Sequence, residues 1–113
     1  PINWGNITAA TNAVLLHEVI NDNVIPNFVA TAPLAGTEPL ISVMGLDVIS
    51  SSTADPMGVR AALRFLPPAS HGSLLDPSDS PASTAEMQGE MAGFIVTRGT
   101  AVQVNNPSVI QSP

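Results

Sequence analysis

Two short apolar runs, residues 14–20 and 59–66, constrain the fold of this chain more than any other feature of its sequence. Polar residues interrupt each run only sparsely, which is typical of strands in a parallel sheet that helices cover on both faces. A turn-forming cluster that ends at Pro26 follows the first run. Pro67 and Pro68 end the second, because proline cannot donate a hydrogen bond to a sheet. The sequence therefore predicts two main strands.

Helix signals follow each predicted strand. Thr37 is the expected N-cap of a first helix that has proline in its first turn and ends at Gly45. Residues 83–86 have the pattern of a capping box and predict the start of a second helix, which ends near Gly99. Four apolar residues at helical spacing are expected to form its buried face: Met87, Met91, Phe94 and Ile95.

The order strand, helix, strand, helix predicts an α/β fold with parallel strands, and a short apolar stretch lies between them at residues 46–49. Ordering about a hundred residues costs on the order of 100–200 kcal/mol, and two main strands bury too little apolar area to offset that cost. Only 11% of the residues are charged, which is few for the surface of a small free-standing domain. We therefore expect a companion segment or chain to complete the sheet.

Composition argues against several classes of protein. The chain has three arginines, no lysine and nine Asp and Glu residues, which give a formal charge of -6. A surface with this charge is unsuited to binding nucleic acid or an anionic lipid surface. No apolar run approaches the roughly 18 residues of a membrane span. Cysteine is absent, which excludes disulfides and cysteine-based metal or redox sites. Because the chain starts at Pro1 and not at Met, we expect a segment to precede it.

The residues suited to catalysis follow the two predicted strands. Asp22 follows the first and His71 follows the second. Functional groups of open α/β sheets collect just beyond the carboxyl ends of the strands. An acid followed by a histidine is also the second half of the order Ser…Asp…His, in which the histidine takes the proton of the serine and the carboxylate holds the other ring nitrogen. Asp22 and His71 are therefore the candidate acid and base.

Four segments carry a resemblance to a known family: NVIPN (23–27), APLAGTEPLI (32–41), SHGSLLDPS (70–78) and TAEMQGEMAGF (84–94). In this order and spacing they resemble the C-terminal part of the bacterial virulence-factor lipase family, and the resemblance covers roughly residues 1–110. Members are extracellular lipases of Gram-negative bacteria with the α/β-hydrolase fold. The resemblance implies that residues 1–113 are the C-terminal part of such a catalytic domain, secreted or associated with the outer membrane.

The resemblance also implies a role for each candidate. Asp22 would be the acid and His71 the base of a triad that hydrolyses carboxylic esters, with acyl esters or lipids as substrates and with no metal or organic cofactor. The nucleophile motif G-x-S-x-G is missing, since the only two glycines four residues apart, Gly89 and Gly93, flank Met91. No HGGG-like oxyanion loop is present either. We therefore expect the serine to come from the companion segment, and this chain alone to be inactive.

Each assignment has an alternative. Asp22 could serve only as a turn former and His71 only as a loop residue, and Asp76 would be the replacement acid if Asp22 were not in reach. The protein as a whole could be a non-catalytic binding module on a hydrolase scaffold, or could use the same triad for another acyl transfer. A serine-bearing G-x-S-x-G turn elsewhere in the molecule would distinguish an enzyme from a binding module.

For the remaining polar and apolar residues of note we expect structural roles or assign none. His17 lies inside the first predicted strand and is expected to be a packed, neutral histidine, and we assign no chemistry to its neighbour Glu18. Asp76 and Asp79 lack the spacing of a calcium loop and are expected to form turns or caps. The methionine stripe of the second helix is expected to face the core and not an acyl chain, and Trp4 has no assigned role.

Overall fold

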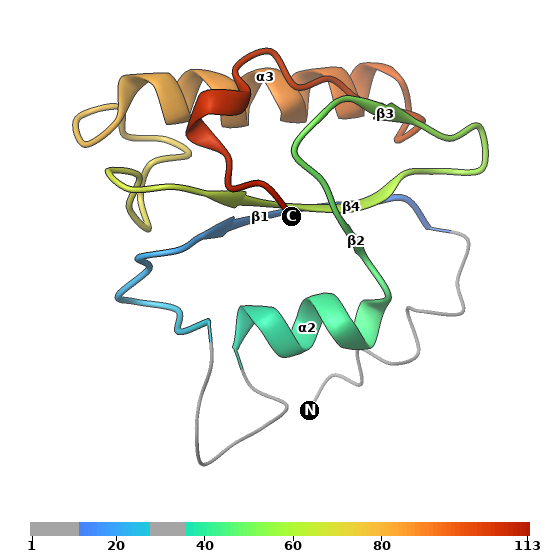
Figure 1. Ribbon diagram of the computed structural model, residues 1–113. Helices are drawn as coiled ribbons and strands as arrows, with labels where there is room; N and C mark the ends of the chain where they lie inside the picture. Colours follow the sequence, from blue (N-terminus) through green and yellow to red (C-terminus); the bar gives the residue numbers. More distant parts are fainter. Residues whose placement is uncertain (1–11, 28–35) are drawn as a thin grey trace.

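The structure, a computed structural model, describes residues 12–27 and 36–113 (Figure 1). Trp4 and part of the 32–41 segment lie outside these residues. Within these residues, eight elements follow one another: β1 (Val14–Val19), α2 (Thr37–Met44), β2 (Asp47–Val48), β3 (Thr53–Ala54), β4 (Arg60–Phe65), α3 (Pro81–Val96), β5 (Ala101–Val102) and the 3₁₀ helix η1 (Pro107–Val109).

A parallel sheet with the strand order β1-β4-β2 forms the centre of the fold. β1 and β4 pair along their whole length, from Val14 opposite Arg60 to Val19 opposite Phe65. Helix α3 covers one face of this sheet and α2 covers the other (Figure 1). The α/β class, the parallel direction and the positions of both main strands are therefore confirmed.

Three further strands are short. The apolar stretch at residues 46–49 supplies β2, which pairs in parallel with the other side of β4. β3 and β5 form a separate antiparallel pair, which was not predicted from the sequence. Each of them contributes only two residues, too few for a period-two pattern to be visible in the sequence.

The N-cap of helix α2 lies one residue earlier in the chain than predicted. Its N-cap is Gly36, at φ 98°, and no side chain caps the helix, so the assignment of Thr37 as N-cap is wrong. Gly36 passes close to the preceding loop, where a Cβ would lie 2.7 Å from the Asn27 carbonyl oxygen. Only glycine tolerates this conformation and this contact. The helix ends as predicted, at Gly45 in the left-handed conformation.

Helix α3 also starts earlier than predicted. Ser80 is its N-cap and accepts a hydrogen bond from the Ser83 N–H, while Pro81 occupies the first turn. The capping box at 83–86 is therefore wrong, because Ser83 and Glu86 already lie inside the helix. Serine followed by proline is itself a strong helix start, and it takes precedence over the pattern three residues later.

The buried face of α3 differs from the one expected. Met87 is 2% exposed and Phe94 packs against the core, but Met91 is 37% and Ile95 is 69% exposed, so their placement in the core is wrong. Glu86 and Glu90 are buried instead. Each of the two carboxyl groups has a hydrogen-bond partner inside the protein. These partners permit α3 to bury a face that contains Glu86 and Glu90 in place of the predicted face.

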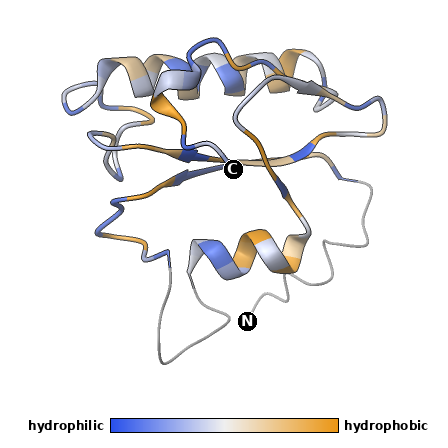
Figure 2. Cartoon of the chain, in the orientation of Figure 1, coloured by the Kyte–Doolittle hydropathy of each residue, from blue (hydrophilic) through white to orange (hydrophobic). Residues whose placement is uncertain are grey.

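The side chains of β4 alternate between two hydrophobic clusters, one on each face of the sheet. Leu63 and Phe65, both fully buried, belong to the cluster under α3 together with Met87. Ala62 belongs to the cluster beside α2, with Ile41 and Met44. Figure 2 shows α2 as hydrophilic at its first turn and hydrophobic toward its end, where it meets the sheet.

β1 forms one edge of the sheet, since no strand among the described residues pairs with its other side. The Val14 N–H donates to the carbonyl oxygen of Val59, just before β4, and the Ile20 N–H donates to that of Phe65 in β4. Alternation therefore directs the N–H groups of Leu15, His17 and Val19 toward the free edge. An apolar cavity of about 360 Å³ lies between β1 and α3, lined partly by Leu15 and Ile95. Within the described ranges, no helix is long and apolar enough to cross a membrane.

Two methionines of α3 provide a matched test of its orientation. We expect Met87→Ala to cost about 2–5 kcal/mol of unfolding free energy, because it leaves a cavity in the core. Met91→Ala removes the same atoms from a partly exposed position and should cost much less. Urea denaturation of both variants measures the difference. Equal losses would contradict this orientation of α3 and favour the face predicted from spacing.

Candidate active site

Asp22 and His71 meet beyond the carboxyl ends of two neighbouring strands. Asp22 lies three residues after β1, and His71 lies six residues after β4. The His71 Nδ1 atom is 3.0 Å from Asp22 Oδ2 and 3.2 Å from Asp22 Oδ1. The expectation that the two side chains lie within hydrogen-bond reach is confirmed. They are separated by 49 positions in sequence, and the parallel pairing of β1 with β4 brings them together.

Asp22 also stabilises the turn that follows it, the role that the sequence offered as its alternative to catalysis. Its Oδ1 accepts hydrogen bonds from the Val24 N–H at 2.9 Å and the Ile25 N–H at 2.8 Å. Burial acts to raise the pKa of Asp22, but the hydrogen bonds from His71 and from the two N–H groups outweigh it and lower the pKa. The carboxylate is therefore ionised at neutral pH, with its orientation fixed by the turn.

The His71 loop has its own hydrogen-bond support. The Ser73 hydroxyl, which is fully buried, accepts a hydrogen bond from the Ser70 N–H at 2.8 Å. Ser70 Oγ donates to Asp79 Oδ2 at 2.6 Å, and Thr84 Oγ1 donates to the Ser73 carbonyl oxygen. The first turn of α3 thus anchors the loop.

His71 is more exposed to solvent than Asp22. Its side chain is 41% exposed, whereas that of Asp22 is 13% exposed. With Nδ1–H donating to the carboxylate, Nε2 carries the lone pair and can accept a proton. Asp22 and His71 also border a cavity of about 190 Å³, together with Leu74 and Met87. The arrangement is that of a general base held by a carboxylate beside a partly apolar space.

The other acidic residues near His71 bond to other partners in the same segment. Asp76 Oδ1 accepts a hydrogen bond from the Ser78 N–H, and Asp79 bonds to Ser70. Asp76 is exposed, and Asp22 occupies the position of the carboxylate beside His71, so no replacement acid is required. Among the residues that the structure describes, no group of three or more His, Asp or Glu side chains is arranged to hold a metal ion.

His17 lies under α3 and packs edge-on against Phe65, with the ring centroids 5.1 Å apart. Its Nε2 is 2.8 Å from Glu90 Oε1, and Glu90 is fully buried. Burial lowers the pKa of His17 to about 4, and burial together with the neighbouring Glu86 raises the pKa of Glu90 to about 9. Both groups are therefore uncharged at neutral pH and are joined by one hydrogen bond, which agrees with the expected packed, neutral histidine.

Two groups of acidic residues pack against the sheet without having been predicted from the sequence. Glu86 and Glu90 lie on the inner face of α3, where Glu86 Oε1 accepts a hydrogen bond from the Asn106 N–H at 2.7 Å. The available signal was the spacing of Ser83, Met87, Glu90 and Phe94 along one helix face. Glutamates are normally exposed, so Glu86 and Glu90 indicated a solvent-facing side of the helix. No pattern in the sequence identifies the backbone N–H groups that compensate the charge of Glu86.

The second group surrounds Arg64 on the opposite face of the sheet. Arg64 Nε and Nη2 each donate to a different Glu38 carboxylate oxygen at 2.8 Å. Arg64 Nε also lies 3.3 Å from Glu18 Oε1. Glu18 is 3% exposed, and burial, together with the nearby Glu38, raises its pKa to about 7. One guanidinium therefore lies between two carboxyl groups.

Glu18 makes the stability of the fold depend on pH. Because its pKa rises from 4.5 to about 7 on folding, the folded protein holds this proton more tightly, and its contribution is lost as pH increases through that window. Glu18→Gln should remove this loss and raise the unfolding free energy at pH 8 by roughly 1–3 kcal/mol relative to its effect at pH 4. Urea denaturation across this pH range measures it. The same pH dependence in both proteins would show that Glu18 does not titrate in this way.

Comparison of the chain with protein-family models, with curated proteins and with solved structures found no match. The assignment of a function therefore depends on the geometry of Asp22 and His71, on the chemistry of these groups and on the resemblance noted in the sequence.

Proposed function

We propose that the chain is part of a serine-dependent carboxylic ester hydrolase in which Asp22 is the triad acid and His71 the base. The observation that carries this proposal is the 3.0 Å contact between His71 Nδ1 and Asp22 Oδ2 beyond the ends of adjacent parallel strands. Acyl esters or lipids are the proposed substrates, on the resemblance to extracellular lipases, and the proposed site of action is outside the cell.

The two groups have distinct tasks in this mechanism. His71 Nε2 takes the proton of the serine hydroxyl as its oxygen attacks the ester carbonyl, and then gives it to the departing alcohol. In the second half, Nε2 takes a proton from the water that attacks the acyl-enzyme and returns it to the serine. Asp22 remains ionised throughout, holds the Nδ1–H tautomer and stabilises the imidazolium.

The serine is proposed to come from a companion segment. Within residues 12–27 and 36–113, no hydroxyl group is hydrogen-bonded to His71. Its neighbour Ser70 donates to Asp79, and Ser73 is fully buried. The free edge of β1 supports a place for the companion, because a further parallel strand there would end beside the loop of Asp22, which contacts His71.

Hydrogen exchange tests the position of the companion strand. In the full-length protein, the N–H groups of Leu15, His17 and Val19 should exchange as slowly as that of Leu16, which points toward β4. Protection of both sets means that β1 is an interior strand. Fast exchange at the three outward groups, with slow exchange at Leu16, would show that β1 stays at the edge and that no companion strand is added.

Kinetics of three variants test the chemical roles. In the full-length protein, His71→Ala should lower kcat for a soluble acyl ester by about 10³–10⁶-fold, because the general base is lost. Asp22→Asn should cause an intermediate loss of up to about 10⁴-fold, because the tautomer is no longer held. His17→Ala is the matched control, and it should lower stability while leaving turnover nearly intact.

Two outcomes would contradict the proposal. Equal losses for His17→Ala and His71→Ala, in folded proteins, would mean that the wrong histidine is assigned. A wild-type protein that hydrolyses no ester and forms no adduct with a fluorophosphonate would indicate the alternative, a non-catalytic binding module on a hydrolase scaffold. The absence of a G-x-S-x-G motif from the chain is the observation that favours this alternative.

A further inference from the structure

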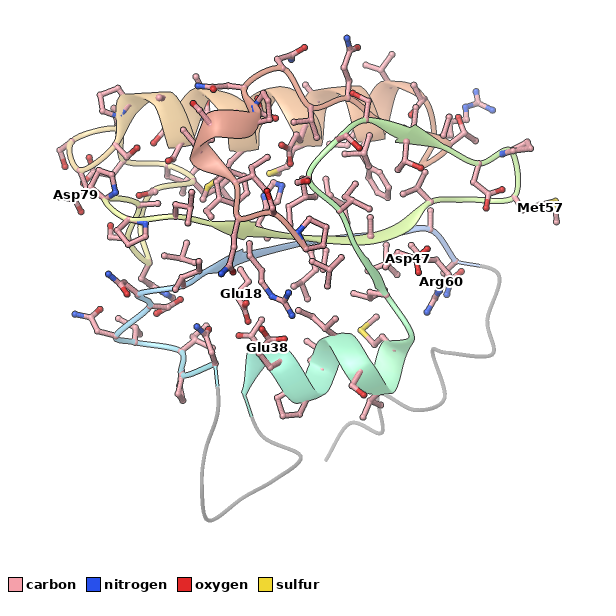
Figure 3. The ribbon with its side chains drawn as sticks, viewed as in Figure 1. Glu18, Glu38, Asp47, Met57, Arg60 and Asp79 are labelled. Carbon is pink, nitrogen blue, oxygen red and sulfur yellow. The ribbon has the colours of Figure 1, made fainter. Side chains whose placement is uncertain are left out.

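Arg64 connects three segments that determine where Asp22 and His71 lie. Arg64 itself is on β4, the strand that leads to His71. It contacts Glu18 on β1, the strand that leads to Asp22, and the two residues are direct neighbours in the parallel ladder. It also contacts Glu38 in the first turn of α2. Figure 3 shows Glu18 and Glu38 directed toward one another between the sheet and α2.

The first turn of α2 holds the far end of the Asp22 loop. The Thr37 N–H donates to the Pro26 carbonyl oxygen at 3.2 Å, and the Glu38 N–H donates to that of Asn27 at 3.1 Å. The Asn27 side chain closes the loop by donating to the Ile20 carbonyl oxygen at 2.9 Å. Residues 20–27 are therefore fixed at one end by β1 and at the other by α2.

The contact between Arg64 and Glu38 has the geometry that fixes an orientation. Both guanidinium bonds are 2.8 Å long and end on different carboxylate oxygens. The Arg64 side chain is 24% exposed and that of Glu38 is 19% exposed, so solvent screens the pair only in part. A planar, two-point contact defines both distance and direction, which a lysine ammonium does not do.

We propose that Arg64 is a positioning residue for Asp22. Acting through Glu38 and the first turn of α2, it fixes the Asp22 loop where Oδ2 meets His71 Nδ1. The inference rests on the proposed function only for its kinetic consequence, since the hydrogen bond between Asp22 and His71 can be measured without turnover.

Arg60 offers a matched control on the same strand. Its guanidinium donates to the Met44 carbonyl oxygen at 2.6 Å and to that of Asn12 at 2.7 Å. It therefore holds the opposite end of α2, away from the Asp22 loop (Figure 3). Arg60→Gln and Arg64→Gln each remove one arginine that joins β4 to α2, but only the second releases the first turn.

The tautomer of His71 reports the effect directly. In full-length protein labelled with ¹⁵N-histidine, at a pH where His71 is neutral, wild-type His71 should be mainly the Nδ1–H tautomer. Asp22→Ala should abolish this preference, and Arg64→Gln should shift the tautomer ratio toward that of Asp22→Ala. Arg60→Gln should keep the wild-type ratio. Circular dichroism verifies that each variant is folded.

Kinetics separate this inference from the proposed function. Arg64→Gln should lower kcat for an acyl ester by about 10–100-fold at a similar KM, the effect of a small misplacement of a catalytic group. Arg64→Lys should restore part of that loss. Arg60→Gln should change kcat by less than about twofold, which is well below the loss expected for Arg64→Gln. A shifted tautomer without ester turnover in any protein would refute the hydrolase function and leave the positioning role.

A folded Arg64→Gln protein with the wild-type tautomer ratio and kcat would overturn the positioning role. If Arg64→Gln does not fold, Glu38→Gln decides the question, because it breaks the two-point contact and leaves Arg64 beside Glu18. Glu38→Gln should then shift the tautomer ratio in the same direction, and a wild-type ratio would overturn the inference.

Discussion

The parallel ladder between β1 and β4 is the interaction on which the rest of the structure depends. It aligns Val14–Val19 with Arg60–Phe65, so two strands that are distant in sequence end side by side. Asp22 and His71 follow these ends, and their contact is a direct result of the register. A shift of one residue would also move Leu63 and Phe65 from the core beneath α3 to the face beside α2. The hydrophobic core and the candidate site therefore impose the same register.

Buried charge is distributed unequally across the two faces of this sheet. On the α3 face, His17 and Glu90 are uncharged and share a hydrogen bond, while backbone N–H groups compensate Glu86. On the α2 face, Arg64 lies between Glu18 and Glu38. Glu18 is buried and the pair of Arg64 with Glu38 is half-buried, so breaking these contacts would leave a partly desolvated charge uncompensated, and the cluster constrains the arrangement of its elements. The charged cluster lies on the face where α2 meets the Asp22 loop, which is why we connect it to the position of Asp22.

The sequence predicted the fold where local patterns were strong. Two short but nearly uninterrupted apolar runs marked β1 and β4, and the positions of Asp22 and His71 after them predicted their contact. The errors occurred where tertiary contacts outweighed local signals. Gly36 and not Thr37 caps α2 because of a close approach to Asn27, and Glu90 displaces Met91 from the core because His17 provides a partner. The two-residue strands and the contacts of Arg64 leave no pattern in the sequence, since they depend on residues far apart in the chain.

In the proposed mechanism, His71, held by Asp22, takes the proton of a serine that lies outside the described residues. The most direct measurement is a crystal structure of the full-length protein after reaction with a phosphonate inhibitor of serine hydrolases. We expect the phosphonylated serine to lie on a segment beside β1, with its Oγ about 2.6–3.2 Å from His71 Nε2. A phosphonylated serine far from His71, or a structure in which Asp22 and His71 are separated, would contradict it.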